Sequence, residues 1–429
     1  MESIWQQHSD RYSFPSLKEN IKTDILIIGG GIAGILTAYF LHKENIPYVL
    51  VEKNTICSGT THNTTAKITS QHGLIYHKIL QSQGLEKTQM YLNANEDAIK
   101  KYKELCRIID CDFEEKDNFV YSTDDADVLE DELAALYKIG FKAEFQKTLP
   151  LPIKTVGAVC FKNQAQFNPL KFLREIAKNL NIYENTFIKE IVGCTAKTPE
   201  HTIEAKKVVV TTHFPFINKH GCYSLKMYQD RSYVIALKNA QNINGMYVDE
   251  KKTGLSFRSY GNFLLLGGGS HRTGKQGGNW DELREVQKKY YPDAEEAAFW
   301  AAQDCMTLDN IPYIGNYSKN TPDIFVATGF NKWGMTSAMV SAMILCDAIK
   351  GKTNDYAEVF YPSRSILTPQ LFINGFESAV SFLTPTTKRC PHLGCALKWN
   401  KEEHSWDCPC HGSRFTQDGK VLDNPANKQ

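Results

Sequence analysis

The sequence predicts an α/β fold that has a buried parallel sheet, a second sheet in the middle of the chain, and a separate cysteine-rich tail with a β-hairpin. Three observations predict this architecture. A glycine-rich turn lies between two apolar runs near the start of the chain, further strand-like runs follow in its middle, and four of the 12 cysteines fall within residues 390–410. The length of 429 residues fits two or three domains.

The composition excludes several classes of protein. With 49 basic and 48 acidic side chains the formal net charge is +1, which argues against nucleic acid as the main partner, because a phosphate-binding surface shows as a basic excess. We expect no transmembrane segment, since no run of about 18 apolar residues occurs. Residues 1–16 lack the apolar core of a secretory signal, so we expect a cytoplasmic protein whose scattered cysteines are reduced thiols.

A β-α-β unit opens the chain. Residues 24–28 form an apolar run that fits a fully buried parallel strand. Residues 32–43 are expected to be helical, with apolar side chains on one face, and residues 46–52 to be a second buried strand. Strand, helix and strand together span about thirty residues, the usual size of such a unit.

The turn at residues 29–34 has the GxGxxG pattern of dinucleotide-binding loops. The first glycine permits the tight turn, the second lets the backbone approach a pyrophosphate, and the third lets helix and strand pack closely. The helix N-terminus offers N–H groups to the phosphates, and Glu52, at the end of the second strand, can accept hydrogen bonds from ribose hydroxyls. A glycine turn without a ligand is the alternative, which the flanking strands and helix disfavour. The predicted contacts are Gly29, Gly31, Ile32, Ala33, Gly34, Glu52 and Lys53.

The later elements follow from the same patterns. Asn168 and Pro169 are expected to cap and open a helix that runs to about residue 180. Residues 350–387 carry several prolines and are expected to be a connector. The other expected elements are a polar helix over 85–106, buried strands over 208–212 and 324–328, strands of a second sheet over 233–237 and 263–266, and an apolar helix over 338–349.

The glycine-rich turn alone does not distinguish NAD from FAD, but two motifs in the second half of the chain do so through their resemblance to a known family. Residues 309–315 read Asp-x-x-Pro-x-x-Gly and residues 327–335 hold a glycine-containing turn. At these positions the chain resembles the D-amino-acid-oxidase-like FAD family, whose members oxidise amines and amino acids. The resemblance extends over roughly residues 20–350 and implies a Rossmann-like FAD domain interleaved with an antiparallel-sheet substrate domain, both within residues 1–360. The implied FAD segments are about 20–80, 150–220 and 305–350, and the implied substrate-domain segments are about 85–150 and 225–300.

The same resemblance implies further FAD contacts. The loop at residues 58–61 matches the one that contacts the pyrophosphate and the flavin, and the turn after the strand at 324–328 matches the one that lies near the isoalloxazine and the ribityl chain. The backbone near residue 188 flanks the adenine by the same comparison. The implied contacts are Ser58, Gly59, Thr60, Thr61, Ile188, Gly329, Gly334, Met335 and Thr336.

Two residues are candidates for substrate chemistry. In the family the second sheet roofs the substrate cavity, and an arginine there often holds a substrate carboxylate through two hydrogen bonds. Arg258 is therefore the expected carboxylate ligand, and His271 the expected acid or base. A surface arginine and a structural histidine are the alternatives. No role is assigned to His62, His72 or His77.

The terminal cysteine cluster has the spacing of a metal site. Its outer frame is Cys-x-His, fifteen residues, then Cys-x-x-His, so each of two short segments supplies one thiolate and one imidazole. A zinc finger usually draws both thiolates from one segment and both imidazoles from the other, which makes zinc the less favoured alternative.

This tail resembles the Rieske iron–sulfur family. The resemblance implies that Cys390 and Cys408 bind one iron of a [2Fe-2S] cluster, and that His392 and His411 bind the other. It also implies a disulfide between Cys395 and Cys410. Such a bond is unexpected in a reducing compartment.

The tail, residues 388–429, is a small all-β unit by this resemblance and is short for a Rieske domain. Residues 396–399 and 405–406 are expected to pair as a hairpin that sets the two cluster loops side by side. By resemblance Ser413 donates a hydrogen bond to the cluster, and Phe415 stands where high-potential members have tyrosine, so we expect a middling potential. A Rieske domain normally has a β-sandwich base, but here the linker at residues 361–387 leads directly into the first cluster loop, so we expect the base to be missing or much reduced. We therefore expect the tail to pack on the first domain or to need the cluster for folding.

The combination predicts an electron relay. Residues 64–67 and 71–73 match a bacterial family of FAD-dependent oxidoreductases with a C-terminal Rieske domain. We expect a dehydrogenase that acts on the C–N bond of a small amine or amino-acid-like substrate and passes electrons singly from FAD to the cluster and to an unidentified external acceptor. Two alternatives stay open: a reductase with electrons flowing from the cluster to the flavin, and an oxidase with a metal- or redox-sensing tail.

Overall fold

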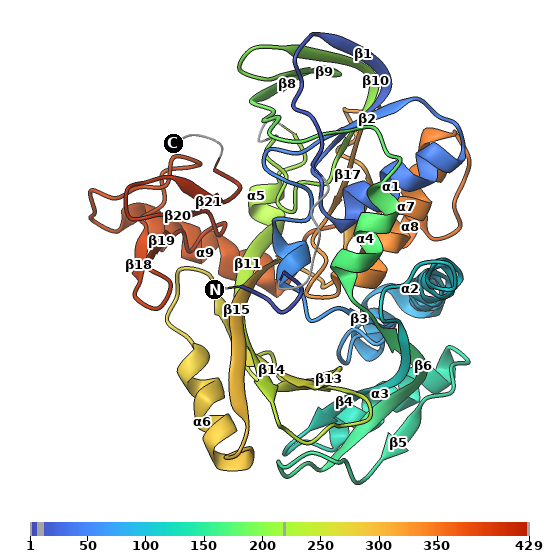
Figure 1. The fold of residues 1–429 in the computed structure, drawn as a ribbon, viewed down its shortest axis with the longest axis vertical. Coiled ribbons are helices and arrows are strands. Elements are labelled where there is room, and N and C mark those ends of the chain that lie inside the picture. Colours follow the sequence, from blue (N-terminus) through green and yellow to red (C-terminus); the bar gives the residue numbers. More distant parts are fainter. Residues whose placement is uncertain (1, 7–12, 218–219, 427–429) are drawn as a thin grey trace.

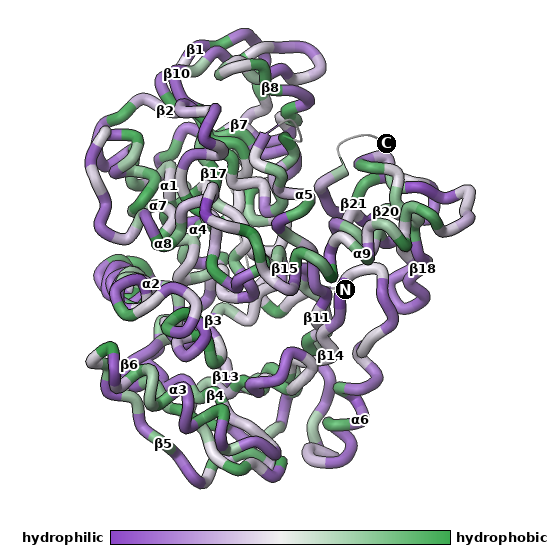
Figure 2. Tube along the Cα trace, turned by 180° about the vertical axis from the view of Figure 1, so that it is seen from behind, coloured by the Kyte–Doolittle hydropathy of each residue, from purple (hydrophilic) through white to green (hydrophobic). Residues whose placement is uncertain are grey.

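The computed structural model describes residues 2–6, 13–217 and 220–426, which form three β-sheets. In Figure 1 the first sheet lies at the top, the second at the bottom, and the third, small sheet to the left of both. Figure 2 shows the small unit from behind, again to one side of the two large ones.

The first sheet is mainly parallel and contains the predicted β-α-β unit. Its central strand β1 (Ile21–Ile28) lies between β10 (Thr202–Val210) and β2 (Tyr48–Val51), parallel to both. The predicted strand at 324–328 is β17 (Ile324–Thr328), parallel to β10. The remaining strands are β7 (Ile182–Tyr183), β8 (Glu190–Val192), β9 (Thr195–Lys197) and β16 (Tyr313–Asn316).

Strand β1 is apolar throughout its second half because both faces of the sheet are covered. Ile25 and Ile27 belong to the hydrophobic core on the side of α1 (Ile32–Lys43), whereas Leu26 and Ile28 belong to the core on the other side. The helix has the predicted bounds. It packs against α7 (Gly334–Ile349), which begins four residues before the expected apolar helix.

The second sheet is mostly antiparallel. The strands predicted at 233–237 and 263–266 lie within β11 (Met227–Lys238) and β14 (Phe263–Arg272), which pair with each other. Strands β3 (Lys67–Ile68) and β6 (Gly157–Gln166) also belong to this sheet, although the segments around them are expected in the FAD domain. The other strands are β4 (Glu114–Ser122), β5 (Glu144–Gln146), β12 (Met246–Asp249), β13 (Ser256–Tyr260) and β15 (Glu295–Thr307).

The helices agree with the predictions except at their ends. Asn168 caps α4 (Pro169–Ala177), since its Oδ1 accepts hydrogen bonds from the backbone N–H groups of Leu170 and Lys171, both at 3.1 Å. The helix stops three residues before the expected end. Helix α2 (Tyr76–Cys106) begins before residue 85 because a short helical segment precedes Gly84, whose φ is 82°. The others are η1 (Thr60–Asn63), α3 (Asp127–Lys138), α5 (Tyr223–Lys226) and α6 (Trp280–Tyr290).

The expected connector at 350–387 is largely helical, which corrects the prediction. It contains α8 (Ala357–Phe360) and α9 (Pro369–Leu383). Pro369 occupies the first turn of α9, where its missing N–H costs nothing, so the proline starts a helix instead of preventing one.

The tail forms a four-stranded antiparallel sheet of β18 (Lys398–Asn400), β19 (Ser405–Asp407), β20 (Arg414–Phe415) and β21 (Val421–Asp423). The expected hairpin is β18 and β19. The tail packs beside β11 and β15 (Figure 1), as expected for a unit that lacks its own base.

Candidate functional site

One large cavity, of about 1400 Å³, joins the glycine-rich loop, the second sheet and the tail. It exceeds the roughly 300–1,000 Å³ of ordinary ligand pockets, so it has room for a dinucleotide and a small substrate together. Of the sixteen predicted FAD contacts, fourteen line it. The two that do not are Gly34 and Thr336.

The glycines of the loop have distinct environments. Gly29 has φ +113°, and a Cβ on Gly34 would lie 1.9 Å from the Gly29 carbonyl oxygen, so helix and strand touch there. A Cβ on Gly31 would meet no atom closer than the Thr61 hydroxyl, at 3.3 Å. Gly31 therefore presents bare backbone to the cavity, as an approaching pyrophosphate requires.

The end of β2 completes this side of the cavity. The Glu52 carboxylate accepts hydrogen bonds from the backbone N–H of Gly30 at 2.8 Å and of Asn54 at 3.0 Å. Glu52 is thereby fixed at the cavity wall, which Lys53 and Ile188 also line. The backbone N–H of Thr186 donates to the Glu52 carbonyl oxygen at 2.8 Å. These residues fit the adenosine end of a dinucleotide, so the donor set agrees with FAD.

Arg258 lies behind the cavity wall. Ser256, two residues earlier on the same face of β13, lines the cavity, but at Arg258 that face is covered. The Arg258 Nη1 donates to the carbonyl oxygens of Thr65 and of Ala66, the latter at 2.8 Å, and Trp5 packs over the guanidinium. The geometry does not support Arg258 as a carboxylate ligand, and that role stays a prediction.

His271 does not line the cavity either. Its ring stacks on Tyr233 with centroids 5.7 Å apart, and its Nδ1 lies 3.2 Å from the Gly269 carbonyl oxygen. Neither contact supports an acid or base role for His271, and that role stays a prediction. His72, to which no role is assigned, is buried and bonded through both ring nitrogens, to Tyr91 and to Thr336.

Lys67 is a cavity residue that the sequence did not single out. It begins β3, is buried, and its Nζ donates to the Thr65 hydroxyl at 3.1 Å. Burial, with a smaller effect from the charge of Arg258, lowers the pKa of the Lys67 ammonium to about 7. Lys67 ends the segment 64–67 that matches the Rieske-bearing flavoprotein family, and this was the available signal, but its burial depends on strands that are distant in the chain.

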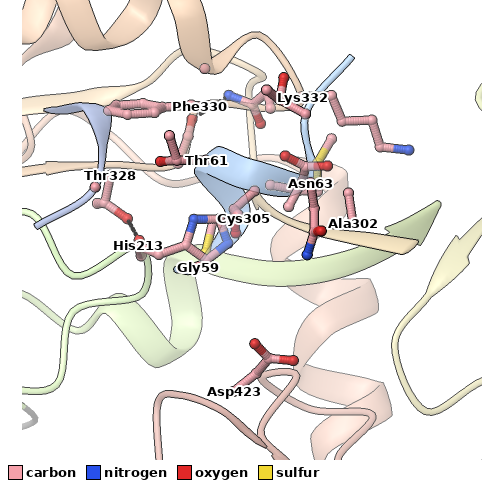
Figure 3. A pocket seen from close by; sticks show the side chains of 18 of the residues that line it. Gly59, Thr61, Asn63, His213, Ala302, Cys305, Thr328, Phe330, Lys332 and Asp423 are labelled. Carbon is pink, nitrogen blue, oxygen red and sulfur yellow. Dashed lines mark hydrogen bonds between the residues drawn. The ribbon is translucent and has the colours of Figure 1, made fainter. Parts of the chain in front are cut away.

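The tail supplies part of the cavity wall. Its contributions are Pro391 and His392 of the first cluster loop, and residues 421–426. Figure 3 shows Asp423 rising from the tail toward the side of the cavity that His213 and Cys305 line. Burial alone would raise the pKa of Asp423, but the charges of the tail and of β11 outweigh it and hold that pKa below its usual value. A single cavity therefore touches the dinucleotide loop and a cluster loop.

The two cluster loops bring the four predicted ligands together. Cys390, Cys408 and His411 are buried, and the rings of His392 and His411 lie with centroids 5.0 Å apart. The sulfur atoms of Cys408, Cys410 and Cys395 lie within 4.8 Å of one another. Two of these three sulfurs belong to a disulfide, whereas Cys408 also hydrogen-bonds to Cys390, so the two predicted cysteine ligands lie together next to the two imidazoles.

The chemistry of these donors fits iron. The His411 Nδ1 is buried and has no hydrogen-bond partner among the described residues, as expected of a ligand nitrogen. A hydrogen bond from Cys408 and others from the backbone N–H of His392 and the Ser413 hydroxyl outweigh burial and lower the pKa of the Cys390 thiol to about 7. The same hydrogen bond, together with burial, raises the pKa of the Cys408 thiol well above its usual value, so the free pair holds one thiolate and iron has to displace the proton of Cys408.

Cys395 and Cys410 form the disulfide that the Rieske resemblance implies, with Cα atoms 6.7 Å apart. The bond joins the first cluster loop to the second across a separation of fifteen residues. The other described cysteines are free thiols.

A buried ion network fixes the tail to β11. Glu403, in the turn between β18 and β19, accepts hydrogen bonds from Arg231 Nε at 3.0 Å and from Arg414 Nη2 at 2.7 Å. Arg414 also donates to Asp407 at 3.0 Å and to Asp423 at 3.1 Å. The side chains of Glu403 and Arg231 are 2% and 4% exposed, so this pair lies at the centre of the contact.

The second cluster loop is held by the second sheet through its backbone. Gln229 donates to the His411 carbonyl oxygen at 2.7 Å, and Gln303 donates to that of Gly412 at 2.8 Å. Arg272 Nε donates to the Pro409 carbonyl oxygen at 2.8 Å. β11, β14 and β15 thus hold the second cluster loop in place.

In the part of the chain that the structure describes, no helix is both long enough and apolar enough to cross a membrane.

Comparison with known proteins agrees with both halves of the site. The family described as FAD dependent oxidoreductase matches residues 24–348, and the Rieske [2Fe-2S] domain matches residues 382–429. The Rieske 2Fe-2S iron-sulfur protein YhfW of Bacillus subtilis (strain 168) is 35% identical, with 100% of this chain and 96% of that protein covered. The chloroplastic cytochrome b6-f complex iron-sulfur subunit of Fritillaria agrestis is 54% identical over 37 residues, which are 9% of this chain and 16% of that one.

Solved structures share the fold of the larger part. Glycine oxidase from Geobacillus kaustophilus superposes with a TM-score of 0.67 at 20% identity, covering 80% of this chain and 99% of that one. L-proline dehydrogenase from P. horikoshii superposes with a TM-score of 0.67 at 19% identity, covering 82% and 98%. With the cavity and the cluster loops, these matches establish that the chain belongs to the D-amino-acid-oxidase-type family of FAD-dependent oxidoreductases and carries a C-terminal Rieske [2Fe-2S] domain.

Proposed function

We propose that the protein oxidises the C–N bond of a small amine or amino acid and delivers the electrons singly, through the Rieske cluster, to an external acceptor. One observation carries this proposal. The cavity that the dinucleotide loop lines is also lined by His392, a predicted ligand of the cluster. Electrons can pass between two redox groups only over short distances, and a shared cavity keeps both groups close.

The chain binds and orients both groups. When bound, FAD accepts two electrons from a substrate, and the cluster carries one electron at a time. The bare backbone at Gly31 and the N-terminus of α1 suit the pyrophosphate, and Glu52 suits the ribose. The side chains of Gln229, Gln303 and Arg272 hold the backbone of the second cluster loop in a fixed position.

Lys67 is the proposed proton acceptor. An amine gives up electrons readily only when it is neutral, so a site for amine oxidation needs a base for the substrate ammonium. The Lys67 Nζ lies in the cavity wall, and its lowered pKa of about 7 makes the neutral amine available near neutral pH. The family neighbours glycine oxidase and L-proline dehydrogenase, named for glycine and L-proline, suggest small amino acids as first substrates.

The test is anaerobic stopped-flow mixing of the loaded protein with small amino acids and amines, including glycine and L-proline. We expect flavin bleaching, followed by a Rieske-type EPR signal in freeze-quenched samples. In a Cys390→Ser variant the flavin should still bleach, but no signal should appear.

Two results would redirect the proposal. If the flavin bleaches while the cluster of the unmodified protein stays oxidised, the relay is wrong. If only an external one-electron donor reduces the cluster and the flavin follows, the electrons flow inward.

A further inference from the structure

Helix α9 (Pro369–Leu383) buries polar side chains and exposes apolar ones. In a helix on a protein surface the apolar side chains normally face the core. Here Asn374 and Ser381 are buried, at 3% and 5% exposure, while the apolar side chains are 46–78% exposed. Those exposed side chains are Phe372, Ile373, Phe376, Val380, Phe382 and Leu383.

The polar face is anchored, which fixes the apolar face outward. The Asn374 Oδ1 accepts a hydrogen bond from Arg272 Nη1 at 2.8 Å. The Ser381 carbonyl oxygen accepts one from the backbone N–H of Ala396 at 3.2 Å, and Glu377 pairs with Lys275. Rotating the helix to hide its apolar side would break all three contacts.

The apolar face is continuous with the first cluster loop. The Phe382 ring lies against Gly394, where a Cβ would sit 3.5 Å from it, and Leu393 is itself 47% exposed. The three phenylalanines alone expose roughly 400 Å², taking about 200 Å² for each whole ring. An apolar patch of this size on a monomer normally marks an interaction site.

The charges around this face are basic. Arg389 donates to the carbonyl oxygens of Phe382 and Gly394, and so lies at the end of the helix with Lys388 beside it in sequence. Both are exposed, and so is Lys398. Between residues 365 and 398 the sequence has one acidic residue, Glu377, and Lys275 neutralises it.

We propose that this face, which we define as the exposed apolar side of α9 with Leu393, Lys388 and Lys398, binds the surface of an anionic lipid bilayer. A helix with exposed Phe and Leu and a basic rim is the composition of an interfacial helix, which inserts its apolar side among the acyl chains and sets its cations among anionic headgroups. The proposal goes beyond the proposed function and does not depend on it.

The experiment is vesicle flotation of the full-length protein, loaded with FAD and cluster. We expect it to float with vesicles of phosphatidylcholine and phosphatidylglycerol, less with phosphatidylcholine alone, and less again at high salt. The double variant Phe372→Glu/Phe376→Glu should bind at least about ten-fold more weakly, because it puts two charges into the apolar layer. Flavin and cluster absorbance confirm that each variant is folded.

The matched control is Ile108→Glu/Tyr137→Glu, which changes two residues that are 82% and 84% exposed elsewhere on the surface. It should bind like the unmodified protein. The proposal is overturned if the loaded protein floats with neither vesicle, or if the control weakens binding as much. It is also overturned if light scattering shows a dimer that the α9 variant dissociates, since a second copy would then cover the face.

Discussion

Replacing Glu403 by Gln should detach the tail from β11. The carboxylate lies between the guanidinium groups of Arg231 and Arg414, and both Glu403 and Arg231 are almost wholly buried. Gln keeps the shape and removes the charge, so Arg231 loses the carboxylate to which it is hydrogen-bonded and keeps only the longer-range attraction of Asp423 and Asp304. Removing one member of a buried ion pair costs about 3–5 kcal/mol, and the near-complete burial leaves little solvent screening to reduce that figure.

The assay is urea unfolding at neutral pH, followed through cluster absorbance and tryptophan fluorescence. The cluster should be lost at a lower urea concentration in Glu403→Gln than in the unmodified protein, with a difference of about 3–5 kcal/mol. The matched control is Glu402→Gln, one position earlier and exposed, which should change stability by less than about 0.5 kcal/mol. Equal unfolding of the two variants would refute the docking role of Glu403.

The pH dependence of this difference follows from the same contact. Burial would raise the pKa of Glu403, but the positive charges of Arg231 and Arg414 outweigh it and hold that pKa below its usual value. A carboxyl with a lowered folded-state pKa stabilises the fold above its unfolded-state pKa, near 4.3 for Glu. The difference in the free energy of unfolding between the unmodified protein and Glu403→Gln should therefore be fully present at pH 7 and should decrease as the pH falls below about 4.3.

Three further predictions concern the cavity and the cluster. Gly31→Ala should fold but bind flavin more weakly, because the added Cβ enters the cavity, whereas Gly34→Ala should unfold at a lower temperature, because its Cβ collides with the Gly29 carbonyl. Flavin content and thermal unfolding distinguish the two effects. A flavin content in Gly31→Ala equal to that of the unmodified protein would contradict the assignment of the loop. The rate of flavin reduction by an amine should increase with pH around 7. In Lys67→Met this increase should disappear, and the rate should fall at least about a hundred-fold, as for loss of a general base. An unchanged pH profile in this variant would show that Lys67 takes no part in the chemistry. Cys395→Ser removes the disulfide and should destabilise the tail by about 3 kcal/mol, the value for a closed loop of fifteen residues. A thiol reductant should lower the urea midpoint of the unmodified protein but should not change that of this variant.

Local pattern was sufficient for the elements that define the nucleotide-binding unit. Helix α1 and strand β17 have their predicted bounds because apolar spacing and flanking glycines determine them within one segment. The two loops that carry the predicted cluster ligands could also be recognised from the sequence, since each holds one cysteine and one histidine at a short, fixed spacing. The four of them meet in the structure through one hairpin.

The remaining features depend on contacts between distant segments. The burial of Lys67 and the covering of Arg258 both arise where residues 65–67 cross the edge of β13, and no spacing in the sequence marks that crossing. The outward apolar face of α9 depends on Arg272 and Ala396, which anchor its polar side from two other parts of the chain. Prolines alone suggested a connector there, because a proline that opens a helix and one that prevents it look alike in sequence.

The central claim is that the flavin site and the cluster exchange electrons across one cavity. Anaerobic single-turnover reduction of the flavin, with freeze-quench EPR of the cluster in the same samples, tests it most directly. The account predicts that a reduced Rieske signal grows after the flavin bleaches, and that it is absent in Cys390→Ser. A flavin that is fully reduced beside a cluster that stays oxidised would contradict the account.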